Sequence, residues 1–328
     1  MARAWHLMNR PQGLPTDDDF ALKDFELPPL GDGMLRVRNQ WLSVDPYMRG
    51  RMNDVKSYVP PFQLGQPMDG GALGEVIESR SDGFVPGDLI QHMAGWRDEA
   101  VIDARTANKL PNLGAPPELF LGVLGVTGLT AYFGLLDAAS AKEGDIVFVS
   151  AAAGAVGSAV VQIAKAKGMK VIGSAGGAEK CEFVRSLGAD QVVDYKAGPI
   201  LKGLAGAAPE GIDVYFDNVG GDHLDAAFAL ARQNARFAIC GMIEGYNDAT
   251  PPSFRFIMRT IAMRIRLKGF IVFDYFPRMG EFYAEMGPWV ANGTVKSRET
   301  VVDGLEAMPE AFRGLFSGDN LGKMLVRL

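Results

Sequence analysis

Between residues 145 and 241, short apolar runs alternate with segments whose apolar positions recur at helical spacing. The run Ile146-Val147-Phe148-Val149 is apolar throughout, which is typical of a parallel strand buried on both faces. Right-handed crossovers between neighbouring parallel strands need a helix, so this alternation predicts a doubly wound α/β domain. The expected strands are 145–150, 170–174, 191–194, 212–217 and 236–240, and the expected helices are 155–167, 179–187 and 222–232. Gly188 is expected to end the second helix in a left-handed conformation.

The residues before about 110 show a different pattern, in which loosely alternating runs are separated by Pro and Gly. This pattern predicts a β-rich region with strands at 34–44, 74–77, 88–92 and 99–102. Helical spacing begins at Pro116, with Leu119, Val123 and Leu124 on one face, and a further helix is expected over 127–136. A new structural unit is therefore expected to begin near this point.

The pattern changes again after the break at Thr250-Pro251-Pro252. It predicts a helix at 254–263, an apolar strand at 265–273 that lies at a sheet edge, and an amphipathic helix at 277–292 that ends at Gly293. Two further strands, at 298–302 and 323–328, are expected around a short helix at 308–316. This last part resembles the first region in its pattern of short strands, so we expect the end of the chain to return to that region.

Length and composition narrow the class of protein. A chain of 328 residues that is 48% hydrophobic and 22% charged predicts two domains. A net charge of −6 gives no broad attraction to nucleic acid or anionic lipid, and no apolar run reaches the roughly 18 residues of a spanning helix. We therefore expect a cytoplasmic protein without nucleic-acid or membrane partners. The two cysteines, Cys181 and Cys240, form no C-x-x-C pair, which disfavours a disulfide framework.

A turn of small residues follows the first strand of the α/β domain. Its sequence, Ala151-Ala152-Ala153-Gly154-Ala155-Val156-Gly157, matches the dinucleotide fingerprint with alanine in the first glycine position. Small residues let the backbone approach a pyrophosphate, and the helix N-terminus favours its negative charge. An ordinary tight turn is the alternative, but the flanking strand and helix favour a cofactor. The expected binding residues in this turn are Ala152, Gly154, Ala155, Val156 and Gly157.

The end of the second strand indicates which nicotinamide cofactor is bound. An NAD-specific site carries a carboxylate there, whereas this chain has Gly173-Ser174-Ala175-Gly176-Gly177. Lys180 follows, and its charge-assisted bond to a 2′-phosphate would be worth about 1.5–3 kcal/mol. NADPH is therefore favoured over NADH, although a lysine taken alone is more commonly a solvated surface residue.

Six motifs occur along the chain: Asp45-Pro46-Tyr47-Met48-Arg49, the 151–157 turn, Phe216-Asp217-Asn218-Val219-Gly220-Gly221, Cys240-Gly241-Met242-Ile243, Tyr246-Asn247 and Gly318-Asp319-Asn320-Leu321-Gly322-Lys323. Together they resemble the medium-chain dehydrogenase/reductase superfamily. Within it, the chain is similar to the zinc-free branch of leukotriene B4 dehydrogenase/prostaglandin reductases, plant alkenal double-bond reductases and bacterial curcumin-reductase-like proteins. The resemblance runs from end to end and implies an NADP-dependent oxidoreductase. It also implies a Rossmann domain at 126–294 and a β-rich, GroES-like substrate domain at 1–125 and 295–328.

The resemblance further implies roles for residues at the matching positions. Lys180 and Tyr195 correspond to groups that hold the 2′-phosphate, and Asn218 corresponds to a residue beside the ribose and nicotinamide. The segments 240–246 and 270–272 correspond to loops over the nicotinamide. Asn320 corresponds to a cofactor contact from the last part of the chain. The cofactor-binding residues expected outside the 151–157 turn are Gly176, Lys180, Tyr195, Asn218, Cys240, Gly241, Tyr246, Phe270, Ile271, Val272 and Asn320.

Metal-dependent relatives carry an early cysteine and a His-Glu pair, but the corresponding stretches here, 43–47 and 68–74, contain no soft ligand. No metal is therefore expected, and His6, His92 and His223 are taken as surface or core residues. Without a metal to polarise a carbonyl, an enone is the easier hydride acceptor. The expected reaction is the NADPH-dependent reduction of the carbon–carbon double bond of an α,β-unsaturated aldehyde or ketone.

Tyr246 is the first candidate proton donor or oxyanion partner because it follows the strand at 236–240, at the carboxyl end of the sheet. A phenol with a pKa near 10 stays protonated at pH 7. The alternatives are that Tyr246 only packs against the cofactor, or that the cofactor's ribose hydroxyl is the donor. Tyr47 is the second candidate, with bracing of its own turn as the alternative. Arg49 and Arg51 would attract an acidic substrate tail, but arginines after a turn are usually solvated.

Two rival functions stay open at this point: an NADPH:quinone oxidoreductase on the same scaffold, and a sensor that binds NADPH without turnover. The aromatic residues Phe270, Phe273, Tyr275 and Phe276 would suit a flat apolar pocket, but such residues more often form a core or an oligomer interface. The expected edge strand at 265–273, together with the resemblance, favours a homodimer.

Overall fold

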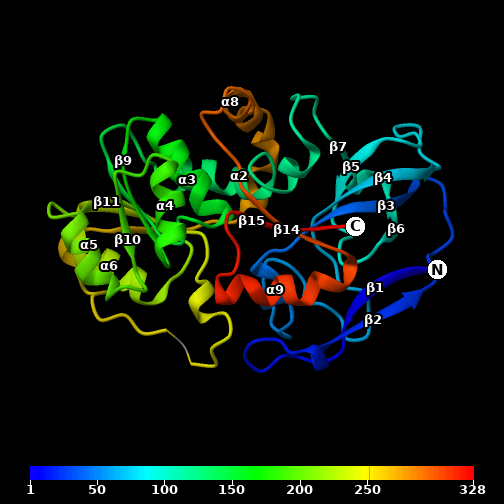
Figure 1. The fold of residues 1–328 in the computed structure, drawn as a ribbon, viewed down its shortest axis with the longest axis horizontal. Helices are drawn as coiled ribbons and strands as arrows, with labels where there is room; N and C mark the ends of the chain where they lie inside the picture. The colour runs from blue at the N-terminus through cyan, green and yellow to red at the C-terminus, as the bar shows by residue number, and fades with distance from the viewer. Residues whose placement is uncertain (251) are drawn as a thin grey trace. The chain divides into compact units, whose positions relative to one another are not determined.

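The computed structural model describes residues 1–250 and 252–328. Pro251, in the break expected at 250–252, lies outside the described residues. The chain divides into two compact units: the first unit is Met1–Leu121 with Glu299–Leu328, and the second unit is Gly122–Arg298 (Figure 1). The boundaries expected from the sequence lie four residues from these at each change of unit.

A six-stranded parallel sheet forms the centre of the second unit, with the spatial order β10-β9-β8-β11-β12-β13. Its strands are β8 (Ile146–Val149), β9 (Lys170–Ala175), β10 (Gln191–Asp194), β11 (Ile212–Asp217), β12 (Ala231–Ile239) and β13 (Arg266–Gly269). The chain moves outward from β8 to β10, crosses back, and then moves outward from β11 to β13. The strand order therefore reverses between β8 and β11, which is where doubly wound sheets bind their ligands. This topology confirms the predicted fold class.

Helices cover the sheet because its central strands are apolar on both faces. The helices of this unit are α2 (Val126–Phe133), α3 (Ala155–Ala166), α4 (Ala178–Ser186), α5 (Ile200–Ala207), α6 (Gly221–Leu230), α7 (Arg259–Met263) and α8 (Met279–Ala291), and α3 to α7 contact its strands. Helices α5 and α6, which lie together in Figure 1, share a buried cluster with Phe148 of β8 and Tyr215 of β11. Helix α3 packs on β8 and β9, and α2 lies beside α3.

The main sheet of the first unit is mostly antiparallel, and its spatial order is β14-β15-β3-β4-β5-β7, with β6 paired to β3. Its strands are β3 (Met34–Ser43), β4 (Ala72–Ser79), β5 (Leu89–His92), β6 (Glu99–Asp103), β7 (Asn108–Lys109), β14 (Glu299–Asp303) and β15 (Lys323–Arg327). Because β15 pairs with β3, the end of the chain returns to the sheet that its beginning forms. Strands β1 (Ala2–Leu7) and β2 (Phe20–Phe25) form a separate antiparallel pair.

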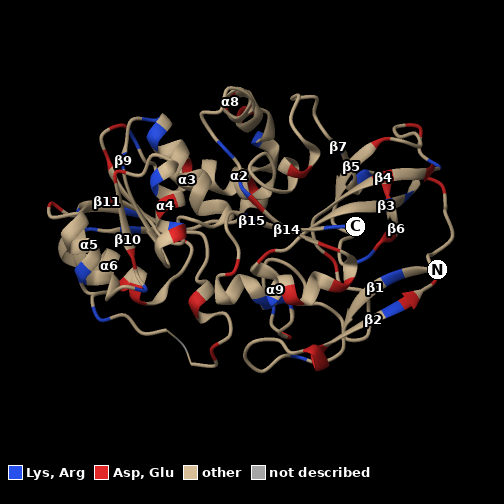
Figure 2. Cartoon of the chain, viewed as in Figure 1, with Lys and Arg blue, Asp and Glu red and all other residues tan. Residues whose placement is uncertain are grey.

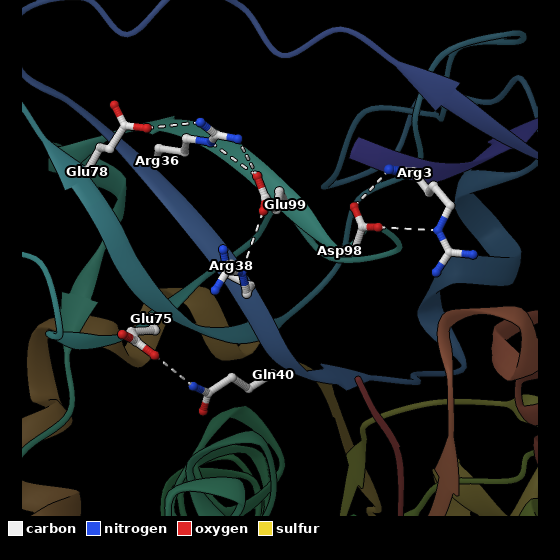
Figure 3. A network of polar contacts seen from close by, with 8 residues as sticks. All are labelled: Arg3, Arg36, Arg38, Gln40, Glu75, Glu78, Asp98 and Glu99. Carbon is white, nitrogen blue, oxygen red and sulfur yellow. Dashed lines mark hydrogen bonds and ion pairs between the residues drawn. The ribbon is translucent and has the colours of Figure 1, made fainter. Parts of the chain in front are cut away.

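Alternation along β3 separates the inside of the first unit from its surface. Leu35 and Val37 are buried in an apolar cluster, whereas the alternate residues Arg36 and Arg38 point outward. Figure 3 shows the outward side chains joined by ion pairs to acidic residues of neighbouring strands, such as Glu99 of β6. A second cluster contains Trp96 and Met48 together with Phe312 of α9 (Met308–Ser317). Period-two alternation thus gives this sheet one apolar and one charged face.

Several sequence expectations for the second unit are wrong in detail. The helix expected from Pro116 is a 3₁₀ turn at Pro117–Leu121, followed by α2 and then a π-helical turn at Gly134–Ala138. The helix expected at 222–232 ends at Leu230, where β12 begins, and α5 was not predicted. By contrast, Gly188 has φ of +97° after α4, as expected of a left-handed cap.

The segment after residue 252 departs most from expectation. Only Arg259–Met263 of the expected 254–263 helix is α-helical, and only Arg266–Gly269 of the expected strand pairs with the sheet. Residues Val272–Arg278 form a 3₁₀ helix, η6, instead of continuing the strand. The expectation of a sheet edge is confirmed, because β13 is the outermost strand.

The hydropathy of the helices bears on membrane contact. In the part of the chain that the structure describes, no helix has both the length and the apolar character needed to cross a membrane.

Candidate cofactor and catalytic site

Most of the predicted cofactor-binding residues lie at one edge of the parallel sheet. Because all six strands run in the same direction, the residues that follow them share the carboxyl edge. The turn 151–157 follows β8, Gly176 follows β9, Tyr195 follows β10, Asn218 follows β11, Cys240 and Gly241 follow β12, and Phe270, Ile271 and Val272 follow β13. The sheet therefore brings together residues that are up to 121 positions apart in the sequence.

The turn after β8 approaches helix α3 so closely that one position has no room for a side chain. A Cβ on Gly157 would lie 2.2 Å from the carbonyl oxygen of Ala151. The N–H of Ala152 donates to the carbonyl of Ser174 at 2.9 Å, which ties the turn to β9. Gly154 precedes α3, and no described side chain caps the start of this helix. Gly154, Ala155 and Val156 are partly exposed, so uncapped N–H groups at an accessible helix start fit a pyrophosphate.

A buried polar cluster fixes Asn218 at the end of β11, beside the point where the strand order reverses. The Asn218 side-chain amide donates to the carbonyl of Ser150 at 2.8 Å, and its backbone N–H donates to the Ser150 hydroxyl at 2.9 Å. Ser150 follows β8, so these two bonds join the ends of the two central strands. Oδ1 of Asp217 accepts bonds from the Tyr215 hydroxyl and from the N–H groups of Val219 and Gly220 at 2.7–2.9 Å. Burial raises the pKa of Asp217.

The ends of β9 and β10 bring Gly176 and Tyr195 together. A Cβ on Gly176 would lie 2.7 Å from the Tyr195 hydroxyl oxygen, so only glycine leaves space for the ring there. The carboxylate of Asp194 accepts the N–H groups of Gly177 and Lys196, both at 2.9 Å, and fixes both loops. Lys180 lies in the first turn of α4, directly after this loop. The geometry thus groups Gly176 and Tyr195 and places Lys180 on the adjoining helix.

The loop after β12 folds back on itself around Tyr246. Its hydroxyl oxygen accepts the N–H of Met242 at 3.4 Å and would lie 3.1 Å from a Cβ on Gly241. The N–H groups of Cys240 and Gly241 both donate to the carbonyl of Asp217, at 3.0 and 3.1 Å. The Tyr246 hydroxyl is therefore held at the carboxyl end of β12. Burial raises the pKa of the Cys240 thiol to about 12, so the thiol is neutral.

Phe270 lies at the end of β13, with its ring near those of Phe216 and Tyr275 at centroid distances of 6.3 and 6.4 Å. A Cβ on Gly134 would lie 2.5 Å from the Phe270 ring. Tyr275 is buried and donates to Asp137 at 2.8 Å, whereas Phe273 and Phe276 are exposed. The four aromatic residues thus divide between core and surface.

Tyr47 and Asn320 belong to the first unit. Tyr47 opens the short helix α1 (Tyr47–Arg51), and its hydroxyl is buried without a hydrogen-bond partner among the described residues. Burial, reinforced by nearby Asp45, raises the pKa of this phenol far above its ordinary value, so it keeps its proton. The Asn320 side-chain amide donates to the carbonyl of Gly322 at 2.8 Å, which shapes the turn before β15.

The expectation that Arg49 and Arg51 are solvated is wrong, because both are buried. The Arg49 guanidinium donates to the carbonyls of Pro11 and Gly13, and Arg51 pairs with Asp69. Long side chains that bind loop carbonyls in this way hold the first unit together rather than attract a substrate. The three histidines are likewise buried, which agrees with the core alternative.

Sequence reasoning overlooked Ser150, Asp217 and Asp194, which organise the loops that bear the candidate residues. Each of them follows or ends an apolar strand, and that position was the available signal. A polar residue at the carboxyl end of a buried parallel strand lies at the edge where ligands bind. The hydrogen bonds that give these residues their roles come from other strands, and one sequence does not display them.

The fold and this edge define a dinucleotide-binding oxidoreductase with a Rossmann-type second unit. Within residues 1–250 and 252–328, no three His, Cys, Asp or Glu side chains gather as a metal site would require, so the residues present do not fit a zinc ion.

Comparison with known proteins specifies the family. Residues 3–110 match a family described as the N-terminal domain of oxidoreductase, and residues 155–291 match one described as zinc-binding dehydrogenase. The NADPH-dependent curcumin reductase of Escherichia coli (strain K12) is 42% identical, over 99% of this chain and 96% of its own length. The NADP(+)-dependent 2-alkenal reductase of Nicotiana tabacum is 40% identical, over 98% and 95%.

The crystal structure of CurA from Vibrio vulnificus in complex with NADPH has a TM-score of 0.94 at 42% identity, covering 99% of this chain and 98% of that one. The chain therefore belongs to the zinc-free branch of the medium-chain dehydrogenase/reductase family, the branch of NADP-dependent reductases that contains these proteins. Membership confirms the predicted family, enzyme class and cofactor.

Proposed function

We propose that this protein reduces the carbon–carbon double bond of α,β-unsaturated aldehydes or ketones with NADPH, without a metal. The observation that carries the proposal is the turn at 151–157, which leaves an uncapped helix start at the reversal point of the parallel sheet. Relatives named curcumin reductase and 2-alkenal reductase, each about as long as this chain, support the choice of substrate class.

The residues at the carboxyl edge divide the binding of the cofactor between them. The 151–157 turn and the N-terminus of α3 bind the pyrophosphate, and Gly176, Lys180 and Tyr195 bind the adenosine end with its 2′-phosphate. Asn218, Cys240, Gly241 and the Phe270–Val272 segment hold the nicotinamide end. A role for Asn320 in cofactor binding, and for the first unit in substrate binding, stays a prediction from the family resemblance.

NADPH supplies the hydride, which goes to the β-carbon of the enone. The negative charge that develops on the carbonyl oxygen needs a hydrogen-bond donor, and the α-carbon needs a proton. A tyrosine hydroxyl accepts and donates hydrogen bonds at the same time, so Tyr246 can accept the Met242 N–H and still donate its own proton. Tyr47, which keeps its proton because of burial, is the second candidate donor.

The test is turnover with NADPH and either a 2-alkenal or a benzoquinone, with the products identified by mass. The proposal predicts the saturated aldehyde as the main product, and exclusive quinone reduction would assign the rival activity. NADPH binding with no turnover on a broad enone panel would indicate a sensor. Tyr246→Phe is expected to lower kcat about a hundredfold with an unchanged Kd for NADPH. Tyr283→Phe, which removes a hydroxyl from α8 and not from the candidate site, is the matched control, with an unchanged kcat expected.

We also propose a homodimer that forms through the exposed edge of β13. Leu267 on this strand is exposed, as are the nearby apolar side chains of Met258, Ile261 and Phe276. An edge strand that lacks a partner on one side and is bordered by exposed apolar side chains is a surface that pairs with a second copy across a two-fold axis. Light scattering is expected to give twice the mass of the chain, and Leu267→Lys is expected to give a monomer. A cytoplasmic location stays a prediction, which cell fractionation tests.

A further inference from the structure

His223 is a buried histidine whose ring nitrogens have no hydrogen-bond partner among the described residues. It lies in the first turn of α6, and 6% of the residue is exposed. Burial lowers the pKa of its imidazole to about 4, so the ring is neutral at neutral pH. A buried polar group without a partner is uncommon and costs stability, so this ring needs an explanation other than hydrogen bonding.

The contacts of the His223 ring are with two aromatic rings. On one side lies Phe148 of β8, nearly parallel, with centroids 6.4 Å apart. On the other lies Tyr195, edge to face, with centroids 5.3 Å apart at an angle of 79°. Edge-to-face pairs at this separation are favourable and orient both rings. His223 therefore connects the buried interior of the sheet to a ring at its carboxyl edge.

Hydrogen bonds fix the backbone of Tyr195, but they do not fix the direction of its side chain. Its N–H donates to the carbonyl of Ala175 at 3.2 Å, and neighbouring Asp194 holds both adjoining loops. The Tyr195 residue is nonetheless 41% exposed, so the direction of its ring depends on the few surfaces that it touches. Gly176 gives the ring space on one side, and His223 supports it on another.

The support beneath Tyr195 is rigid. Gly220, just before α6, donates its N–H to the buried Asp217 carboxylate at 2.8 Å, and the N–H of Leu224 donates to the Gly220 carbonyl at 3.0 Å. Leu224 is buried in the same cluster as Phe148. A ring held on an anchored helix can define the position of an exposed neighbour.

We propose that His223 is a positioning residue for NADPH, acting through ring contact with Tyr195 to hold its hydroxyl at the 2′-phosphate of the cofactor. This inference rests on the proposed role of Tyr195 in cofactor binding. It assigns the effect to the shape of the ring and not to its nitrogens. Phenylalanine at this position therefore preserves the function, and alanine removes it.

The experiment compares His223→Ala and His223→Phe by KM and kcat for NADPH and NADH with one 2-alkenal. For His223→Ala, the KM for NADPH is expected to rise about five- to tenfold, the equivalent of one aromatic pair, with the kcat and the KM for NADH unchanged. His223→Phe is expected to match the wild type. Equal rises for both cofactors, or a loss in His223→Phe equal to that in His223→Ala, would overturn the proposal.

A double-mutant comparison separates positioning from a general structural role. In a Tyr195→Ala background, His223→Ala is expected to cause no further rise in the KM for NADPH, because the residue that it positions is gone. Additive losses would overturn the inference. His92→Ala removes a buried histidine of the first unit and is the control for lost stability, with an unchanged NADPH-to-NADH ratio expected.

If the proposed 2′-phosphate site itself is wrong, the kinetic results differ from those expected when only the role of His223 is wrong. If the wild type shows no preference for NADPH over NADH, and Lys180→Ala leaves both KM values unchanged, then the 2′-phosphate site itself is wrong. If the wild type prefers NADPH and His223→Ala keeps that preference, only the role of His223 is wrong.

Discussion

The two main sheets of this protein use polar side chains in opposite ways. In the second unit, polar residues such as Ser150 and Asp217 are fully buried at the carboxyl ends of strands, where they hydrogen-bond to the turns. In the first unit, Arg36 and Arg38 of β3 form ion pairs with Glu99 of β6, as Figure 3 shows, and Figure 2 shows charged residues along the chain of both units. The difference separates buried residues that shape the turns of the candidate site from partly exposed residues that pair on the surface of a sheet.

The environment decides what each set contributes to stability. When a substitution leaves a buried donor or acceptor without its partner, the free energy of unfolding falls by the full desolvation penalty of that group. An exposed ion pair gains little, because water and salt screen it and ordering its long side chains costs entropy. Substitutions in the two sheets are therefore expected to differ in the size of their effects on stability.

The largest effect is expected for Asp217→Ala. The change leaves the Tyr215 hydroxyl and the N–H groups of Val219 and Gly220 without their acceptor. With about 1–2 kcal/mol for each buried donor, the free energy of unfolding should fall by about 4 kcal/mol. Urea unfolding followed by circular dichroism measures it. A loss below about 1 kcal/mol would show that water replaces the carboxylate at this site.

Asp217→Asn tests the same residue through its pH dependence. The amide oxygen can take the place of Oδ1, but the amide nitrogen would lie at the Oδ2 position, which has no partner among the described residues, so a loss of about 1–3 kcal/mol that does not vary with pH is expected. Burial raises the pKa of the Asp217 carboxyl in the folded state, so its stabilising contribution is present below the unfolded value of about 3.9 and is lost as pH rises through the folded value. Asparagine does not titrate. Asp217→Asn should therefore gain stability relative to the wild type as pH rises, and a constant difference across pH would contradict the raised pKa.

The next effect is expected for Gly157→Ala in the turn after β8. The added Cβ would lie 2.2 Å from the Ala151 carbonyl oxygen and 2.9 Å from Cα of Ala152, both backbone atoms, so the turn must move. Overpacking of this kind costs about 3 kcal/mol, and NADPH affinity should fall as well because we propose that the same turn binds the pyrophosphate. Calorimetry of NADPH binding and thermal unfolding measure the two losses.

Gly206→Ala is the matched control for that substitution. Gly206 lies in α5, and its added Cβ would meet no atom within 4 Å. Alanine has the higher helix propensity, so this variant should gain about 0.5–1 kcal/mol and bind NADPH as the wild type does. Equal behaviour of the two variants would mean that the close approach at Gly157 is unimportant.

The contrast between the sheets also explains what the sequence could reveal. The strands β8, β9, β10 and β11 were predicted because each has a short apolar centre between segments of helical periodicity. The 151–157 turn was predicted because a backbone close to a pyrophosphate tolerates only small residues. Both signals are local, so a single sequence contains them.

Features that depend on distant or solvent-facing contacts were not predicted. The segment from Phe254 to Arg278 contains apolar residues that face outward, so its hydrophobic pattern indicated a longer helix and strand than the structure has. The burial of Arg49 depends on carbonyls of the loop at Pro11 and Gly13, far away in the sequence. The contact of His223 with Tyr195 joins two elements separated by α5 and β11. Such pairings arise from tertiary packing, which local periodicity does not determine.

The smallest effect is expected for Arg36→Gln on the outward face of the first sheet. Arg36 donates from two nitrogens to Glu99, at 2.8 and 3.1 Å, and from a third to Glu78 at 2.9 Å, yet 38% of its side chain is exposed. The Glu99 side chain is 19% exposed, so the pair is only partly buried. Surface pairs contribute up to about 1 kcal/mol, and the coupling between Arg36→Gln and Glu99→Gln in a double-mutant cycle should be of that size. The coupling should shrink further in molar salt, because the screening length falls to about 3 Å. A coupling as large as the Asp217→Ala loss, or one that salt does not change, would mean that this charged face stabilises the fold as the buried cluster does, and the distinction between the two sheets would fail.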